Sequence, residues 1–550
     1  MRIADLFRRG KPAGPAGPVG VQVKLKTHNR PSAQRAGLVL PGPLWWALVL
    51  AIAFYALAHV SIMQGVWPMH GTAPGANAML GRDVVSLVAW LALLAALRWM
   101  RYQGKWAIVV FPILIFCLGR PELFQVFTDP AYQAHGGAKA RANDLKATRS
   151  RLSTINRAYD QERKEEVYQG PPPPLPDPFR QAVGKVVNPG SVLTGLLSNA
   201  SVFIAPLALL VGYFVARRRE RLRKFREKRL IPFILLMGLF GVLAFVFTAA
   251  ATGKVGNTTP WELFLPVFVA VWAATLADDA YNLARPGQVV APRRLGSLFL
   301  YGVLPIVPFL RIHELGLTIV LAMAMAAMLL VGTRRGWWAL LLLVVWSGMA
   351  YEVFQHDDRS QIRFELAYHP YKPVASFADE AARQKWAGKL HQMKLFDANV
   401  LAGDVLGQGA GRGHGETAPN SADDGYITLF AAQWGLLGGV ALVLLYTLFL
   451  MHLFAAAARE EGAFERTLIT GLAMLIGVPF WLAALGGIRV VPLTGVVAAF
   501  AANGGAKLLA SAFGVGIIAG LSHLRSEEER LEGVLASPAG PPSAPGVRVV

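Results

Sequence analysis

Cysteine is almost absent from this chain: Cys117 is the single one in 550 residues. A disulfide framework and a cysteine-based zinc site both need several cysteines, so both are excluded. A cleavable signal peptide is not evident, because the first apolar run begins only near Pro43, after a basic tail. The apolar runs also lack the alternating polar faces of soluble elements, which excludes a soluble multidomain protein.

Apolar sequence is what the chain has in abundance. Hydrophobic residues make up 54% of it, and many uninterrupted runs reach about 18 residues or more, the length that spans a bilayer. We therefore predict an all-α, polytopic membrane helical bundle. The formal net charge is +20, but the basic residues cluster in short loops beside apolar runs. That placement is typical of cytoplasmic topology signals and not of a nucleic-acid interface.

The apolar runs predict about twelve spans, with both ends of the chain cytoplasmic. The basic run from Arg217 to Arg229 is the strongest marker of the cytoplasmic side. The expected spans are 43–64, 84–100, 106–119, 199–216, 230–250, 261–277, 295–312, 315–332, 337–354, 426–454, 467–487 and 495–521.

Composition further divides the chain into regions. We expect a disordered basic tail at 1–42, a transmembrane hairpin at 43–105, a transmembrane core at 106–522 and a cytoplasmic tail at 523–550. Two long polar segments, 120–198 and 355–425, are expected on the outer side. The first holds a charged helical stretch and a proline run, and is either a surface ornament or a partner-docking element.

The stretch from Gly403 to Gly438 begins as a polar, glycine-rich loop and ends inside an apolar run. Asp424 lies two residues before the expected helix, where a carboxylate can face both water and the lipid headgroups. Such a group can act on a lipid-borne substrate, or it can simply stabilise the amino-terminal end of the helix. Asp423 is a second candidate for that capping role.

These residues resemble a known family. The segment PNSADDGYITLFAAQWGLLG (419–438) is similar, without a gap, to the P-E-A-H-T-D-F-I-F-A-x-x-A-E-E-L-G-x-x-G signature of the SEDS family (shape, elongation, division and sporulation), which includes FtsW, RodA and SpoVE. The resemblance puts Asp424 on the catalytic aspartate of that family, whose members have ten spans. It covers about 106–522, so the hairpin at 43–105 is extra.

Further fragments follow in the order of the family. GDVLGQGAG (403–411) is similar to G-G-L-F-G-K-G-L-G, TTPWELFLP (258–266) to Q-P-S-E-F-x-K, and HELG (313–316) to P-D-L-G. Arg363 and Pro370 fit R-x-x-x-x-x-D-P, and PLTGVVAAFAANGGAKLL (492–509) resembles P-x-T-G-x-P-L-P-F-x-S-Y-G-G-S-S-L-L.

The chain also departs from the family pattern at several positions. The histidine and threonine before the aspartate are Ala422 and Asp423, the two glutamates after it are Ala432 and Gln433, the lysine of Q-P-S-E-F-x-K is Leu265, the serine-tyrosine pair is Ala502 and Asn503, and Lys507 stands where the family has serine.

The resemblance implies polymerisation of lipid II on the outer face of a bacterial inner membrane, beside a class B penicillin-binding protein transpeptidase. Asp424 would be the catalytic base that takes the proton of the acceptor hydroxyl. The leaving polyprenyl pyrophosphate needs a cation, and Mg²⁺ or Mn²⁺ is a candidate cofactor. The candidate substrate-binding residues are Glu262, Glu314, Arg363, Lys507, Gly407, Gly409 and Gly411.

Other functions stay open. The glycines do not follow a strand, which excludes a nucleotide-binding P-loop, and no metal-ligand spacing accompanies His414. A non-catalytic scaffold or lipid-carrier flippase is a second hypothesis, favoured by the changed positions around Asp424. A third is another polyprenyl-linked sugar enzyme, such as an O-antigen ligase or polymerase. The sequence does not separate a role in cell division from one in cell shape.

Overall fold

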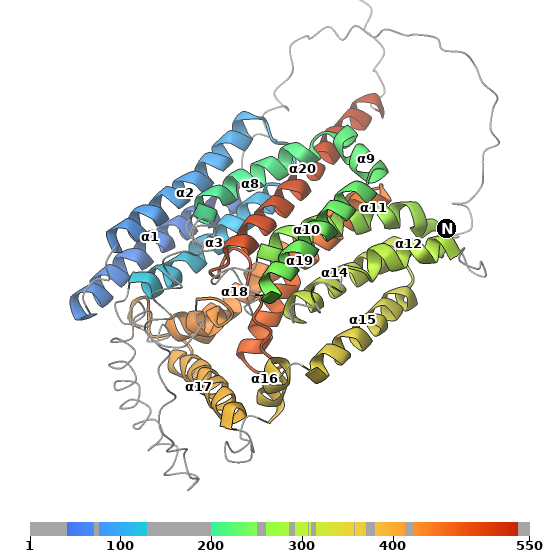
Figure 1. Ribbon diagram of the computed structural model, residues 1–550. Coiled ribbons are helices and arrows are strands. Elements are labelled where there is room, and N and C mark those ends of the chain that lie inside the picture. The colour runs from blue at the N-terminus through green and yellow to red at the C-terminus, as the bar shows by residue number, and fades with distance from the viewer. Residues whose placement is uncertain are drawn as a thin grey trace, which may run out of the picture. The chain divides into compact units, whose positions relative to one another are not determined.

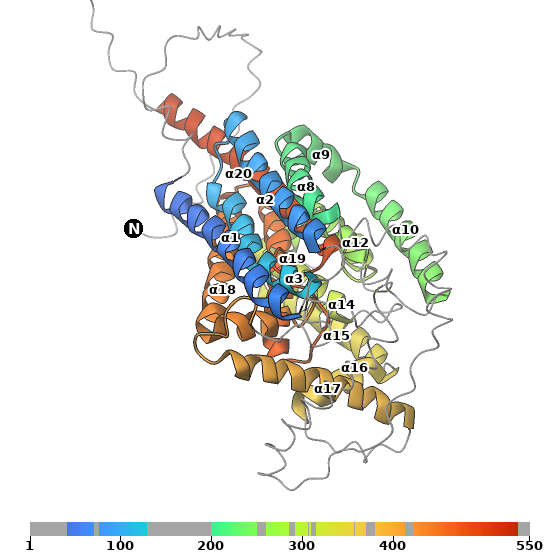
Figure 2. The same ribbon diagram turned by 90° about the vertical axis from the view of Figure 1, so that its left-hand side faces the viewer.

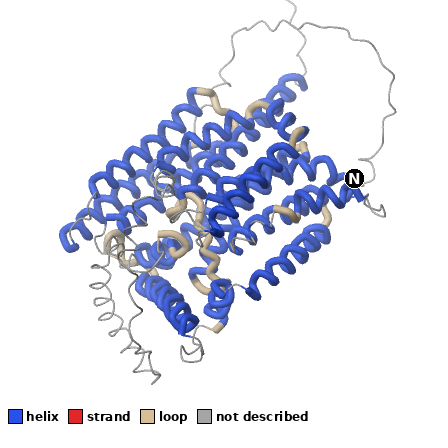
Figure 3. The backbone as a smooth tube through the Cα atoms, viewed as in Figure 1, coloured by secondary structure: helices blue, strands red, loops and turns tan. Residues whose placement is uncertain are grey.

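The computed structural model describes residues 41–70, 76–128, 200–249, 260–284, 292–305, 307, 309, 315–356, 358–369, 380–412 and 422–536. Every regular element in these ranges is a helix, which confirms the predicted all-α fold (Figure 3). The predicted tail before residue 41, the insert from 129 to 199 and Glu314 lie outside the described residues. The helices are α1 (Gly42–His70), α2 (Ala76–Trp99), α3 (Trp106–Thr128), α8 (Ser201–Ala216), α9 (Arg219–Glu227), α10 (Leu230–Ala249), η4 (Pro260–Phe264), α11 (Leu265–Ala284), α12 (Pro292–Gly302), α14 (Leu315–Thr333), α15 (Gly336–His356), α16 (Asp358–Tyr368), α17 (Glu380–Gly403), α18 (Tyr426–Arg459), α19 (Ala463–Gly487) and α20 (Gly505–Ala536).

Eight segments of the described chain are long and apolar enough to cross a membrane, and they lie in α1, α2, α3, η4–α11, α14, α18, α19 and α20. A ninth is added if α8 and α9, which are bent by 83°, form one span. The chain is thus a multi-pass membrane protein, while the total of twelve spans remains a prediction.

The interior of the bundle is built around α3 and α20. In their most apolar windows 94% and 89% of the residues are buried, against 33% in α1 and 28% in α2. A helix that is apolar all round is expected either in a protein interior or against lipid. The sequence does not distinguish these two places, but the packing puts α3 and α20 in the protein interior. Figures 1 and 2 show α1 and α2 side by side along α3, at the edge of the bundle.

Close contact between α8 and α20 depends on glycine. A Cβ atom at Gly212 would overlap the backbone oxygen of Phe513, and one at Gly516 would overlap that of Leu209. Small residues let membrane helices approach closely and gain van der Waals contacts. These two glycines therefore fix the central helix α20 against α8.

The third span is longer than predicted, because α3 continues to Thr128 instead of ending near residue 119. Arg120 and Glu122 interrupt the apolar run in the sequence, yet both are buried. Arg120 Nε donates to Asp83 Oδ1 over 2.7 Å, and Glu122 accepts a hydrogen bond from Trp434. Partners on other helices thus allow the helix to continue through charged residues.

The last span is shorter than predicted, because α20 begins at Gly505 and not near 495. Gly495 and Phe500 have φ values of 76° and 69°, which a right-handed helix does not accommodate. The preceding stretch 492–504 consequently has no helix. Lys507 therefore lies in the first turn of α20 and not deep inside the span.

The predicted outer loop 355–425 contains the helices α16 and α17. Trp386 and Phe396 of α17 form a small separate core with Leu366 and Leu493. In Figure 2, α17 runs across one end of the bundle, beside the start of α18. This end of the protein is therefore structured by its own apolar contacts.

Candidate active site

Asp424 lies in the turn at residues 422–425 that leads into α18, and its side chain is only 6% exposed. The turn is fixed by Asn503, whose backbone amide donates to Ala422 O over 2.8 Å. The Asn503 side chain also donates to Asp423 Oδ1 over 3.3 Å. Gly425 is the N-cap residue of α18 and no side chain caps it. The N-cap position itself is therefore occupied by neither aspartate.

The loop from Gly403 to Arg412 is joined to α18 by an exchange of backbone hydrogen bonds. Gln408 N and Gly409 N donate to the carbonyls of residues 432 and 433. In return, the amides of residues 436 and 437 donate to the carbonyls of residues 404 and 405. In an unbroken helix, the amides of residues 436 and 437 would instead donate to the carbonyls of residues 432 and 433, as two i to i−4 bonds. The helix is instead opened at Gly435, where φ is 65° and ψ is −168°.

The backbone amides of Gly407, Gly409 and Gly411, three of the candidate substrate-binding residues, all donate to groups of the protein itself. The amide of Gly407 donates to Gly403 O over 2.7 Å, and that of Gly409 donates to Gln433 O over 2.9 Å. The amide of Gly411 donates to Gln125 Oε1 over 3.2 Å. A phosphate cradle needs these N–H groups to point at the ligand. They bind the protein itself, so the glycines serve to seat the loop.

The end of α3 completes this arrangement. Gln125 is 1% exposed, and its Oε1 accepts hydrogen bonds from Gly411 N and from the side chain of Gln433. Glu122 of the same helix binds the indole N–H of Trp434. Neither residue was identified from the sequence, because both fall in the segment expected to lie outside the membrane. Polar residues spaced three apart directly after an apolar run were the available signal.

The hairpin of α1 and α2 also contacts the loop. Ser61 Oγ donates to Ala410 O over 2.9 Å. A Cβ atom at Gly65 would lie 3.2 Å from Gly411 O, so the two backbones are in close contact. The ring centroids of Phe54 and Trp434 are 4.7 Å apart. The extra hairpin therefore packs directly on the loop that precedes Asp424.

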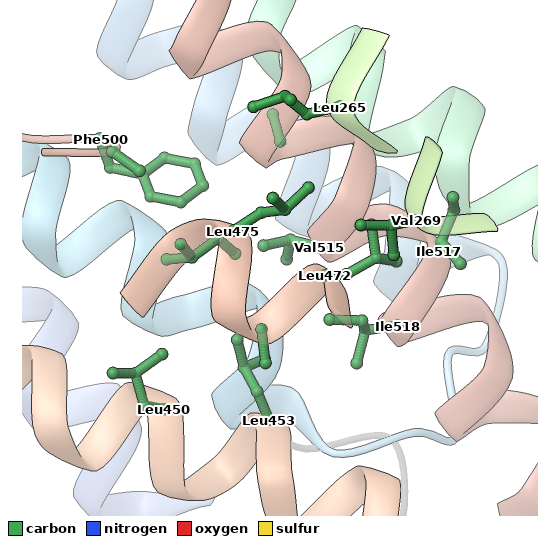
Figure 4. Packing of buried hydrophobic residues seen from close by; sticks show 14 of the residues in the cluster. Leu265, Val269, Leu450, Leu453, Leu472, Leu475, Phe500, Val515, Ile517 and Ile518 are labelled. Atoms are coloured by element: carbon green, nitrogen blue, oxygen red, sulfur yellow. The ribbon is translucent and has the colours of Figure 1, made fainter. Parts of the chain in front are cut away.

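Glu262 and Lys507 occur together inside the bundle. Their exposed fractions are 3% and 2%, and both side chains line one small cavity between η4, α11, α19 and α20. Lys507 Nζ donates to Leu475 O over 2.8 Å. The rest of the lining is almost entirely apolar and includes Leu265 and Leu472, which belong to the main hydrophobic cluster (Figure 4).

Arg363 lies in a second pocket, at the end of the bundle that carries α16 and α17. This pocket measures about 320 Å³ up to its open mouth, and Lys389 and Arg489 also line it. Arg363 Nη1 donates to Thr494 O over 3.1 Å, and Arg489 forms an ion pair with Asp397. The sequence identified Arg363 but not the two other cations, which belong to no fragment of the family pattern.

The predicted site residues therefore lie in three places. Asp424 lines neither of the two pockets described above. One segment nevertheless connects all three, because Thr494 binds Arg363, Asn503 fixes the turn of Asp424, and Lys507 faces the cavity of Glu262. In the part of the chain that the structure describes, no three His, Cys, Asp or Glu side chains form a metal site. The residues present therefore do not assemble a metal centre by themselves.

The fold and the site together define a multi-pass helical membrane protein with a buried carboxylate just before a helix that is broken at Gly435. Its family follows from comparison with known sequences. The model of the cell cycle protein family of FtsW, RodA and SpoVE matches residues 196–527, which is more than half of the chain. The protein belongs to this family. The match includes Asp424, Glu262, Arg363 and Lys507, and it begins after the hairpin and α3.

Individual relatives are more distant. The peptidoglycan glycosyltransferase RodA of Mycobacterium tuberculosis (strain H37Rv) is 26% identical over 235 residues, which are 42% of this chain and 47% of RodA. The chain thus spans about half the length of the mycobacterial relatives that it matches. A probable peptidoglycan glycosyltransferase FtsW of Nitrosococcus halophilus is 25% identical over 329 residues, or 57% of this chain and 80% of FtsW.

Two solved structures are also similar. A chain from a study of polymerisation and crosslinking by a peptidoglycan synthase complex has a TM-score of 0.42 and 17% identity, covering 62% of this chain and 93% of that one. A variant of the rod shape determining protein RodA from Thermus thermophilus has a TM-score of 0.34 and 16% identity, covering 61% and 93%.

Proposed function

We propose that this protein is a peptidoglycan glycosyltransferase that polymerises lipid II at the outer face of a bacterial inner membrane. The observation that carries the proposal is the family match over 196–527, which contains Asp424 in its turn before α18. The names of the RodA and FtsW relatives point to the same reaction. A role in cell division or in cell shape agrees with both sets of relatives.

In the proposed reaction the acceptor hydroxyl oxygen bonds to the anomeric carbon of the donor sugar. The bond between that carbon and the pyrophosphate oxygen breaks, and polyprenyl pyrophosphate leaves. Asp424 takes the proton of the hydroxyl as the new bond forms, which is general base catalysis. Its nearly complete burial favours this role, because a base in a site that excludes water interacts strongly with a developing charge.

The leaving pyrophosphate needs positive charge beside it. The pocket of Arg363, Lys389 and Arg489 is a candidate to provide it, since guanidinium groups bind phosphates through paired hydrogen bonds. A divalent cation such as Mg²⁺ or Mn²⁺ would add further charge if it arrived with the substrate. No step of the proposal depends on such an ion.

The distribution of charge supports an outward orientation of Asp424, with both termini in the cytoplasm. Two contacts lie at the far end of α11 and of α18 from the candidate site. Arg226 of the basic helix α9 binds Asp278 over 3.0 Å, and Arg525 binds Glu461 over 2.8 Å. The part of α18 after the break at Gly435 runs from residue 436 to 459, so at 1.5 Å per residue it alone spans about 36 Å. The basic end would face the cytoplasm.

A non-catalytic scaffold or flippase is the second candidate. One observation favours it: two glutamate positions of the family pattern are Ala432 and Gln433, and both now take part in seating the loop. A class B penicillin-binding transpeptidase is the partner we propose under either function. Under the scaffold hypothesis this partner would carry the activity of the complex.

The test is strand synthesis by the full-length protein in liposomes with lipid II, with and without the transpeptidase. We expect Asp424→Asn to lower the rate by roughly 100-fold or more, the usual contribution of a general base. Asp423→Asn is the matched control, since asparagine still offers an oxygen to Asn503, and its rate should stay within about threefold of the unmodified protein.

Each alternative has its own outcome in this assay. Full activity of Asp424→Asn would remove Asp424 from catalysis. No synthesis by the unmodified protein, even with its partner, would support the scaffold. Activity confined to other polyprenyl-linked sugars would support the third hypothesis, a ligase or polymerase of a different glycan.

A further inference from the structure

Two departures from the family pattern meet in one cavity. The lysine of the Q-P-S-E-F-x-K motif is Leu265 in this chain, and a lysine appears instead at position 507, where the family pattern has serine. The two positions are 242 residues apart (507 − 265) and belong to different helices. Both side chains nevertheless line the same cavity, together with the glutamate of the motif, Glu262.

The surroundings leave each charge strongly dependent on the other. Glu262 and Lys507 are the two ionisable side chains in the lining, and both are more than nine-tenths buried. Because the two side chains line one cavity, their opposite charges interact favourably. Moving an ion from water into such an interior is costly, and an opposite charge nearby lowers that cost. A cation in this cavity is therefore favourable beside Glu262, whichever helix supplies it.

We propose that Lys507 replaces the missing motif lysine, so that the cation of the family pattern has moved from α11 to α20. The pair of Glu262 and Lys507 then acts as a positioning device. The lysine occupies the first turn of α20 and binds Leu475 O of α19. It thereby fixes where α20 begins and, through the residues just before it, the position of Asn503.

This position matters for the candidate site. Asn503 holds the turn of Asp424 through two hydrogen bonds, and Thr494 in the same segment accepts from Arg363. A shift at the start of α20 is therefore transmitted to both. The proposal rests on the proposed function only for its activity readout, because the role of the lysine can be tested through stability alone.

The experiment returns the lysine from position 507 to position 265. The full-length protein is compared with Lys507→Ser, with the double variant Leu265→Lys/Lys507→Ser, and with the uncharged control Leu265→Met/Lys507→Ser. Thermal unfolding in detergent and strand synthesis from lipid II are both measured. We expect Lys507→Ser to unfold at a lower temperature and to lose at least tenfold in rate.

The double variant with lysine at position 265 should recover both properties, to within about threefold in rate, and the methionine control should recover neither. If Lys507→Ser does not accumulate in cells, recovery of the folded protein in the lysine double variant alone supports the proposal equally. Unfolding of Lys507→Ser at the unmodified temperature would overturn it. Equal behaviour of the lysine and methionine double variants would overturn it as well.

The two readouts separate this proposal from the proposed function. If the lysine double variant recovers stability but even the unmodified protein makes no glycan strands, the relocation of the lysine is retained and the glycosyltransferase is refuted. Strand synthesis by the unmodified protein, with no recovery in the lysine double variant, would retain the glycosyltransferase and refute the relocation.

Discussion

Gly407 and Gly409 both have positive φ values, 83° and 91°, but their surroundings differ. A Cβ atom at Gly407 would overlap the backbone of Gln433, whereas a Cβ atom at Gly409 would have open space around it. The left-handed conformation alone costs a residue other than glycine roughly 1–2 kcal/mol. Any further loss of stability in a Gly407 variant therefore measures how strongly the loop is held against α18.

We predict that Gly407→Ala lowers the free energy of unfolding clearly more than Gly409→Ala, which should lose only about 1–2 kcal/mol. Thermal unfolding of the two variants in the same detergent is the measurement. Equal losses would mean that the loop is not held against α18 in the way described.

At the scale of single residues, the sequence identified the charged side chains but not the groups that surround them. Asp424, Glu262 and Lys507 stand out because ionisable groups beside apolar runs are uncommon. Only the structure shows that Glu262 and Lys507 share one cavity, since nothing in a local pattern relates residues on η4 and α20. Gln125 was missed for a similar reason: its role depends on an amide of Gly411, far along the chain.

At the scale of elements, the contact between α1 and the loop offers a direct test of the hairpin. Gly65 of α1 faces Gly411, whereas Gly81 of α2 has no neighbour within 4 Å of an added Cβ. We predict that Gly65→Leu displaces the loop, and that Gly81→Leu does not. Leucine favours a helix more than glycine does, so neither change should harm its own helix.

Hydrogen exchange of the amides of residues 407–411 is the measurement for this pair. We expect Gly65→Leu to speed it by about tenfold or more, which corresponds to a local loss of about 1.4 kcal/mol, and to lower strand synthesis. Unchanged exchange in Gly65→Leu, or an equal increase in Gly81→Leu, would mean that the hairpin does not hold the loop.

The lengths of apolar runs predicted several helices to within a few residues, as in α8, α14 and α15. The exceptions are instructive. The break in α18 at Gly435 was not predicted, because the run of residues 426–454 is apolar throughout. It arises from hydrogen bonds with the loop at residues 404–409, and hydropathy alone contains no information on such bonds.

At the scale of the whole molecule, the orientation across the membrane is a prediction that labelling can check. Cys117 is fully buried, so its thiol should stay unlabelled and the unmodified chain can serve as the background. Lys394 of α17 and Lys228, which follows α9, are both exposed. The helices α17 and α9 lie towards opposite ends of the bundle (Figure 1).

A membrane-impermeant maleimide should label Lys394→Cys in intact spheroplasts, and should label Lys228→Cys only after permeabilisation. This follows because the basic residues around α9 are expected to stay in the cytoplasm. The reverse pattern would turn Asp424 towards the cytoplasm and would contradict the proposed reaction at the outer face.

The contact between the hairpin and the loop also depends on the order in which the chain is synthesised. Ser61 and Ala410 are separated by 349 residues. At the usual ribosomal rate of about 5–20 residues per second, roughly 20–70 s elapse between the synthesis of the two. During this interval α1 and α2 are already inserted while the loop that they will contact does not exist, so lipid must cover their inner surface. The contact between α1 and the loop that precedes the candidate active site therefore forms late in translation.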